Sequence, residues 1–281
     1  MRYYSGLTFT EAGLVIGLLL LAPWMARRGR WRRVIDPRYR LSLAAMGFFS
    51  GAATALYIAA LAYTTPANAA ITAQIEVIYS AILASYFLGE RPGLQQSLAS
   101  LLVIAGTGLI MAHDLRSPRW RGDLMILATP WMYQVSHIFS KRLPKDFDAV
   151  TVSGGRVFYG LLALLPLAAW LQSRGPSFSL APAALRSLLL QGVFLSSLNF
   201  VLWYRAILNM DLAKATAVLL SYPALTMLFS WMLGRESVAP IQVAGLAVTL
   251  TGAFWISSLV LKSQARLPES ERVPPETADE V

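Results

Sequence analysis

Residues 67–88 read ANAAITAQIEVIYSAILASYFL, and this stretch contains a single acidic or basic side chain, Glu76. Blocks of this kind follow one another along a chain of 281 residues that is 56% hydrophobic and 14% charged. A helix needs ~20 apolar residues to cross ~30 Å of hydrocarbon. Lipid cannot satisfy backbone polar groups, and the blocks do not alternate with a period of two, so they form helices. The sequence therefore predicts an all-α integral membrane protein.

Nine such blocks can be counted, and they leave little chain for any soluble domain. The predicted spans are Leu7–Met25, Leu41–Tyr63, Ala67–Leu88, Gly93–Ala112, Leu124–Ser140, Val150–Leu171, Leu185–Leu208, Ala213–Leu233 and Val238–Leu261. The tail from residue 262 to residue 281 is polar and contains three prolines, so we expect it to be disordered.

The distribution of Lys and Arg predicts the orientation in the membrane. Seven arginines lie in one loop between the first two spans: Arg27, Arg28, Arg30, Arg32, Arg33, Arg38 and Arg40. The loops on that side carry 15 Lys and Arg residues, whereas the opposite loops carry 7. Loops rich in Lys and Arg stay in the cytoplasm. We therefore expect a protein of the plasma (inner) membrane with a cytoplasmic carboxyl tail. The net charge of +9 is then explained by the orientation of the chain in the membrane and not by binding to nucleic acid.

An internal repeat divides the chain. With one offset of 146 residues, from Glu90 to Glu236, three small residues also recur. They are Ala67, Ala69 and Gly106, which return as Ala213, Ala215 and Gly252. We expect a first repeat at 1–112 with four helices and a second at 122–261 with five, so a first helix is expected to be missing. Because a five-helix unit has an odd number of spans, two units in tandem are inverted, as in many secondary transporters.

Two stretches resemble EamA-type permeases of the drug/metabolite transporter superfamily. The first runs from ALAYTTPANAA at 60–70 through YFLGER at 86–91 to IAGTGL at 104–109, and the second from Tyr222-Pro223 to LGRE at 233–236. The resemblance implies ten helices in two inverted five-helix halves around a central cavity. Two departures from the family are expected: the chain is expected to lack the family's first helix, and Val77 stands where the second repeat keeps a proline, Pro223.

Glu76 is the leading candidate for a site residue. A charged group inside a span costs ~2.5–3.5 kcal/mol to insert and is by default a functional hypothesis. Its repeat partner, at the offset of 146, is Tyr222. Inverted halves would bring the two together near the middle of the membrane, where Glu76 binds solute or carries a proton. The alternative is a carboxyl group that pairs with a neighbouring helix for packing.

A second set of polar and aromatic side chains is expected to line the same cavity. In the fifth predicted span, Gln134 lies three residues and Tyr133 four residues before His137, spacings that share a helix face, and we expect the face of Trp131, Gln134 and His137 to line the cavity. Pro130 should kink that span and free a carbonyl group. The other expected lining residues are Gln74, Tyr79, Asn199 and Trp203. For these side chains, the alternative is a structural hydrogen bond between helices.

Two further patterns concern packing. Arg156 and Arg205 lie within spans, and we expect them to snorkel to the cytoplasmic surface. Arg156 could instead neutralise Glu76 or an anionic solute. Small residues recur every four positions at Gly245, Thr249, Ala253 and Ser257, which predicts a close contact between two helices.

The sequence thus predicts a permease that moves a small organic solute by alternating access, with export as the expected direction. No enzyme, metal or cofactor is expected, because only two histidines and no phosphate-binding or nucleophile motif occur. The alternatives are a membrane-embedded sensor or scaffold subunit and an intramembrane enzyme. The expected partners are the solute and the lipid bilayer, with no nucleic acid. Proton coupling and a homodimer are left open.

Overall fold

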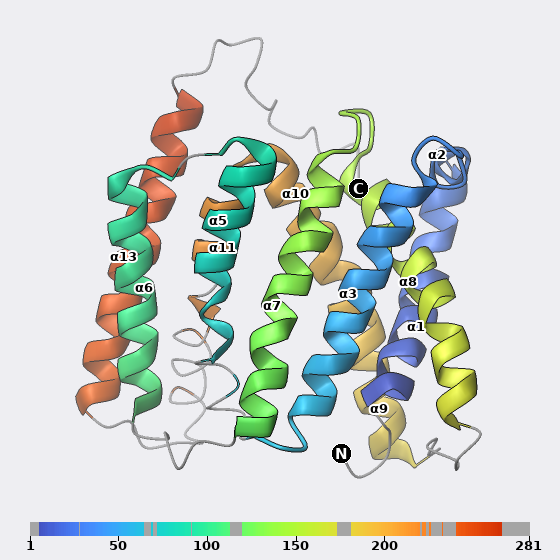
Figure 1. The fold of residues 1–281 in the computed structure, drawn as a ribbon, viewed down its shortest axis with the longest axis horizontal. Helices are drawn as coiled ribbons and strands as arrows, with labels where there is room; N and C mark the ends of the chain where they lie inside the picture. The colour runs from blue at the N-terminus through green and yellow to red at the C-terminus, as the bar shows by residue number, and fades with distance from the viewer. Residues whose placement is uncertain are drawn as a thin grey trace. The chain divides into compact units, whose positions relative to one another are not determined.

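The computed structural model describes residues 6–27, 29–64, 72–90, 92–112, 120–172, 181–219 and 240–265, with the single residues 69, 221, 222, 225 and 232. The elements in these residues are all helical (Figure 1). They are α1 (Gly6–Arg27), α2 (Arg30–Val34), α3 (Arg40–Ala60), α5 (Glu76–Leu88), α6 (Leu94–Ala112), α7 (Trp120–Lys141), α8 (Ala149–Gln172), α9 (Pro182–Leu190), η1 (Gln191–Leu198), α10 (Asn199–Asn209), α11 (Leu212–Leu219) and α13 (Pro240–Ala265).

The prediction of a helical integral membrane protein is confirmed. Within the described residues, five helical segments are long and apolar enough to cross a bilayer. These segments are Leu7–Arg27, Arg40–Ala60, Ala149–Pro166, Pro182–Asn209 and Pro240–Leu259. The count of nine spans and the inverted repeat stay predictions. Residues 262–265 of the tail expected to be disordered are helical, because α13 continues to Ala265, and the rest of that tail and most of the predicted span after residue 222 lie outside the described residues.

The chain forms two compact units. The first comprises Met1–Arg91 and Asp114–Leu208, and the second comprises Pro92–His113 and Asn209–Val281. In the first unit, α3 packs against both α7 and α8, α1 packs against α8 and η1, and α5 packs against α7 (Figure 1). In the second unit, α6 runs beside α13 (Figure 1), and α11 also contacts α13.

Glycine permits the close approach of α3 and α8. A Cβ atom on Gly47 would lie 2.8 Å from the carbonyl carbon of Tyr159 and 2.9 Å from the carbonyl oxygen of Arg156. These neighbours are backbone atoms, which cannot rotate away. The two helices therefore touch through their main chains, and this contact fixes the position of α8 beside α3.

The small-residue stripe makes the contact that the sequence predicts, in the second unit. A Cβ atom on Gly106 of α6 would lie 2.7 Å from the carbonyl oxygen of Gly245 and would also meet Thr249 of α13. Further along the same pair, a Cβ atom on Gly252 would lie 2.8 Å from the carbonyl oxygen of Ala99. The prediction of close packing at Gly245 and Thr249 is confirmed.

The predicted span Ala67–Leu88 is not one uninterrupted helix. Gln74 and Ile75 form a turn, and α5 begins only at Glu76. The backbone N–H of Ile78 donates to the carbonyl oxygen of Ile75, three residues back, at 2.9 Å. β-Branched residues crowd this stretch and lower its helix propensity. Glu76 therefore lies at the amino end of a helix rather than in its middle, and there the helix dipole favours a carboxylate.

The predicted span Leu185–Leu208 also departs from a plain α-helix. Its central part, η1, is a π-helix that joins α9 to α10 without a break. A Cβ atom on Gly192 would collide with the side chain of Ile16, so η1 and α1 lie in close contact. A π-helix widens the turn and shifts the side chains that follow it, and such segments are frequent at functional sites. Here it sets which residues of α10 face the interior of the first unit.

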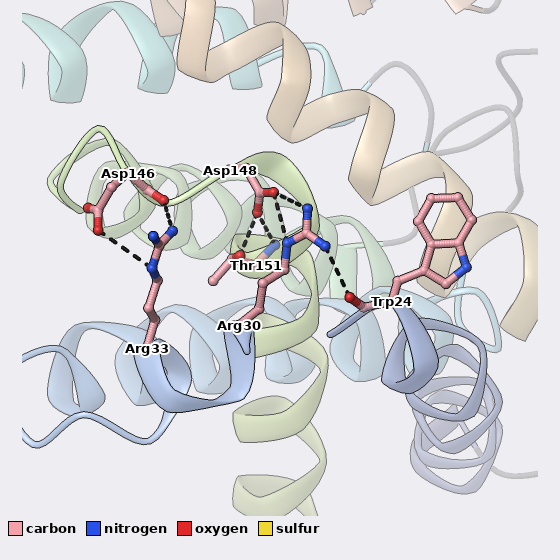
Figure 2. A network of polar contacts seen from close by, with 6 residues as sticks. All are labelled: Trp24, Arg30, Arg33, Asp146, Asp148 and Thr151. Carbon is pink, nitrogen blue, oxygen red and sulfur yellow. Dashed lines mark hydrogen bonds and ion pairs between the residues drawn. The ribbon is translucent and has the colours of Figure 1, made fainter. Parts of the chain in front are cut away.

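Polar contacts join the loops at one end of the first unit (Figure 2). Arg30 donates through Nε to Asp148 at 2.9 Å and through Nη1 to the carbonyl oxygen of Trp24 at 3.0 Å. Arg33 pairs with Asp146 beside it. Asp148 also caps α8, because its Oδ1 accepts the backbone N–H of Thr151 at 2.8 Å. The arginine loop and the loop before α8 therefore share one side.

The loop after α5 lies on that same side, because its Glu90 forms an ion pair with Lys141 at the end of α7. At the other end, the hydroxyl of Thr64 donates to Asp123 at 2.6 Å, and the guanidinium of Arg121 lies 4.1 Å from the ring centre of Tyr63. These contacts assign the loops to the same two sides as the count of Lys and Arg residues does.

Labelling of single cysteines tests which end is cytoplasmic. The natural chain has no cysteine, so Arg32→Cys and Ser117→Cys each carry one thiol. Arg32 is exposed on α2, whereas Arg30 is engaged with Asp148. In intact cells, an impermeant maleimide should label residue 117, and it should reach residue 32 only after permeabilisation. Labelling of residue 32 but not of residue 117 in intact cells would reverse the topology.

The first unit should become less stable at low pH, because the carboxylate of Asp148 becomes protonated there. Burial alone would raise the pKa of this carboxyl group, but hydrogen bonds from Arg30 and Thr151 outweigh burial and hold the pKa below its ordinary value. A carboxylate with a lowered folded pKa stabilises the protein above its unfolded value, about 4, and this contribution disappears as the pH falls through the folded value.

Asp148→Asn should accordingly cost about 1 kcal/mol at neutral pH, a modest figure because solvent screens a carboxylate side chain that is 44% exposed. Thermal melts of the detergent-solubilised protein between pH 3 and pH 7 measure this. The wild type and the variant should converge at the acid end. A constant gap at every pH would show that the charge of Asp148 does not stabilise the fold.

Candidate functional site

The structure brings two of the predicted site residues into direct contact. Gln134 of α7 donates through Nε2 to Oε1 of Glu76 at 2.9 Å. Gln134 is fully buried, and Glu76 is half-buried at the start of α5. The amide holds the carboxyl group toward α7. The contact places an acid and its partner inside the first unit.

One helical turn further along α7, His137 forms a second polar pair. The indole N–H of Trp203 donates to Nδ1 of His137 at 3.3 Å, and the two rings lie 5.2 Å apart. Because Nδ1 accepts, the neutral imidazole carries its proton on Nε2. On its other side the ring stacks with Tyr133, at a centroid distance of 6.5 Å. The predicted face of Tyr133, Gln134 and His137 is thus turned into the first unit.

A buried guanidinium completes this arrangement, which we name the central polar cluster (Glu76, Tyr133, Gln134, His137, Arg156 and Trp203). Arg156 of α8 is 2% exposed, and its Cζ atom lies 3.1 Å from the ring centre of Phe200. The positive charge of Arg156 interacts electrostatically with the side chains of Tyr133, His137 and Tyr204. The prediction that Arg156 snorkels to the surface is wrong, because close packing of α8 against α3 turns the side chain inward. Arg205, by contrast, is exposed.

The carbonyl group expected to be free beside Pro130 is occupied. Pro130 cannot donate to the carbonyl oxygen of Ile126, four residues back. The hydroxyl of Thr129 donates to that oxygen instead, at 2.9 Å. The α7 helix continues through this point to Lys141. The prediction of an available main-chain acceptor in α7 is therefore wrong.

The remaining predicted residues lie outside the hydrogen bonds of the cluster. Trp131 is 45% exposed and packs edge-on against Phe49 of α3. Asn199 is exposed at the start of α10, and Tyr79 is half-buried on α5. Gln74 is buried in the turn before α5, and its amide atoms have no hydrogen-bond partner in the described part of the chain. Tyr222 belongs to the second unit and is 39% exposed, so its predicted meeting with Glu76 stays a prediction.

Three contributors to the site were missed in the sequence. Thr54 of α3 bonds the hydroxyl of Tyr133 at 2.7 Å. Phe200 and Tyr204 of α10 pack beside Arg156 and His137. The spacing of Phe200, Trp203 and Tyr204 by three and four residues places them on one helix face, and this signal was present. Nothing in the sequence showed that the π-helix turns this face toward α7.

The fold and the central polar cluster define a helical membrane protein in which the buried Arg156 lies within a segment that can cross a bilayer, Ala149–Pro166. The model of the EamA-like transporter family matches residues 1–112 and 120–258. The chain belongs to the EamA-like transporter family, and the resemblance predicted from the sequence is confirmed. The protein is accordingly an integral membrane protein of a transporter family.

Individual relatives agree with this assignment. The "Probable terminal-alkyne amino-acid exporter" of Streptantibioticus cattleyicolor is 29% identical over 69% of this chain and 65% of that protein, which is less than two thirds of its length. The "Uncharacterized protein PA1977" of Pseudomonas aeruginosa is 30% identical over 84% of this chain and 78% of its own length. A solved crystal structure shares the fold with a TM-score of 0.74 and 18% identity, over 92% of this chain and 89% of the other.

Proposed function

We propose that this protein moves a small organic solute outward across the plasma (inner) membrane by alternating access, with its carboxyl tail in the cytoplasm. The observation that carries the proposal is the contact of Gln134 with Glu76 at 2.9 Å, which joins two of the spans predicted from the sequence within the first unit. An acid held there by a buried amide costs insertion energy, and membrane proteins place such groups on solute or proton paths.

Interrupted helices support alternating access. The turn at Gln74 and Ile75 has a counterpart 146 residues later, because α11 ends at Leu219 and Ser221 lies in a turn. In that turn, the backbone N–H of Ser221 donates to the carbonyl oxygen of Val218 at 3.1 Å. Transporters built from inverted repeats form their sites where helices of both halves are broken near the membrane midplane. The matching turns also support the proposed repeats at 1–112 and 122–261.

The proposed roles divide between two groups of side chains. Glu76 binds solute or carries the coupling proton, with Gln74 and Gln134 as its neighbours, and His137 with Trp203 is the second polar group. The aromatic and polar lining proposed from the sequence comprises Tyr79, Trp131, Asn199 and Tyr222. No metal or cofactor takes part in this proposal. The described residues contain no cluster of three or more potential metal ligands.

The direction and the solute class draw on a relative. The protein from Streptantibioticus cattleyicolor bears the name of an amino-acid exporter, and its alignment with this chain covers 69% of the residues of this chain. An exporter of an amino acid or a similar metabolite fits the cluster, because a polar solute needs polar partners where water is excluded.

Reconstitution into liposomes tests the proposal. Liposomes that contain the purified chain are loaded with a pool of unlabelled metabolites, and each labelled metabolite is added outside. Exchange of labelled for unlabelled solute then reports transport without an energy source. Saturable uptake of at least one solute is expected. No exchange of any metabolite, together with stable binding of a partner protein, would instead indicate a sensor or scaffold subunit. Covalent turnover by the purified chain would indicate an enzyme.

A further inference from the structure

Arg156 is a buried positive charge whose hydrogen-bonding capacity is largely unused. The residue is 2% exposed, and neither Nε nor Nη1 has a hydrogen-bond partner within the described part of the chain. A guanidinium can donate five hydrogen bonds, and an isolated buried charge is costly. Stability alone would favour an apolar side chain at this position.

No acid of the described residues neutralises Arg156. The ion pairs among those residues involve other cations, such as Arg30 and Lys141. Inside the first unit, the carboxyl group of Glu76 is bonded to Gln134. The ionisable side chains that share electrostatic interactions with Arg156 are Tyr133, His137 and Tyr204, none of which carries a negative charge at neutral pH. The position is therefore prepared for a negative charge that this part of the chain does not provide.

We propose that Arg156 receives the carboxylate of the transported solute. This inference rests on the proposed transport function and names the class of solute. A single guanidinium matches a carboxylate with one negative charge better than a phosphate with about two. The rings around Arg156 suit an organic remainder, since Phe200 lies against the guanidinium and Tyr133 and Trp203 flank His137 nearby.

The central polar cluster also offers this solute partners for a second polar group. Tyr133 interacts electrostatically with both Arg156 and Glu76, so the cation and the acid belong to the same neighbourhood. A solute whose carboxylate is bound at Arg156 can therefore present another polar atom toward Glu76 and Gln134. When the solute binds, its carboxylate neutralises the charge of Arg156 and accepts a charge-assisted hydrogen bond from it. Such bonds are stronger than hydrogen bonds between neutral groups.

Matched solutes test the charge requirement directly. The probes are a pool of amino acids and simple aromatic and aliphatic monocarboxylic acids, and a second pool of the corresponding primary amides, which have nearly the same shape without the charge. The acid pool should raise the melting temperature of the purified wild type, and the amide pool should not. Binding of the active acid to Arg156→Gln should be about 10- to 100-fold weaker, whereas Arg156→Lys should retain part of it.

The melting temperature without any solute separates a binding role from a structural one. A residue kept for binding costs stability, so Arg156→Gln should melt at the same temperature as the wild type or higher. Protection by amides equal to that by acids, no protection by any acid, or full acid binding by Arg156→Gln would overturn the inference. If liposomes then exchange a neutral or cationic solute, the proposed transport function survives without it.

Discussion

Replacing Gly47 with alanine is expected to cost about 3 kcal/mol, enough to remove much of the folded protein. The added Cβ atom would meet the main chain of α8 at Tyr159 and Arg156, so α3 and α8 would have to separate. The carbonyl oxygen of Arg156 is one of the contacted atoms, at 2.9 Å, so the change would also displace the buried guanidinium. Melting temperature and yield of monodisperse protein in detergent measure the effect.

Gly51→Ala provides a matched control one helical turn further along α3. There the new Cβ atom would lie 3.0 Å from a methyl group of Leu164, and that side chain can rotate away. A loss of less than about 1 kcal/mol is expected, because alanine also raises helix propensity. Equal melting temperatures for the two variants would contradict the view that main-chain contact between α3 and α8 limits stability.

Glu76→Gln is expected to reduce flux about 100-fold while leaving the amount of folded protein unchanged, since glutamine keeps the shape and can still bond Gln134. Glutamine would lose the charge-assisted hydrogen bond that the carboxylate is proposed to make to the solute, and such a bond is worth about 1.5–3 kcal/mol. Initial rates in liposomes at pH 5–8 give the measurement. Asp146→Asn removes an equal charge from an exposed loop and should keep near-normal flux.

The pH series distinguishes two roles for Glu76. If the carboxyl group carries the coupling proton, Glu76→Gln should retain exchange between two equal solute pools but lose the pH dependence of uptake. If it binds the solute, exchange itself should fall. Full flux in Glu76→Gln across the whole pH range would remove the residue from the mechanism.

The sequence predicted the broad fold because hydrophobic length is a local property. Blocks such as Leu7–Met25 and Leu41–Tyr63 correspond to α1 and α3 within a few residues at each end. The grouping of Gln134 and His137 on one face also followed from helical spacing. Both inferences depend only on the period of one helix.

The sequence failed where neighbouring helices decide the outcome. The turn before Glu76, the π-helix at 191–198 and the burial of Arg156 all depend on contacts between segments far apart in the chain. Arg156 illustrates the point, because snorkelling is the usual behaviour of an arginine near a span end. The burial of Arg156 and the contact of its guanidinium with the ring of Phe200 show that its side chain is directed inward.

The double role of Asp148 has a consequence for how the protein responds to ionic strength. Its carboxylate accepts from Arg30 and also caps α8, the helix that carries Arg156 about 12 Å further along. Salt screens an ion pair at a partly exposed site, but it does not remove a hydrogen bond to a backbone N–H. In concentrated salt, the arginine loop should loosen from Asp148 while the first turn of α8 stays formed. The buried guanidinium would then keep its place in an osmotically stressed cell.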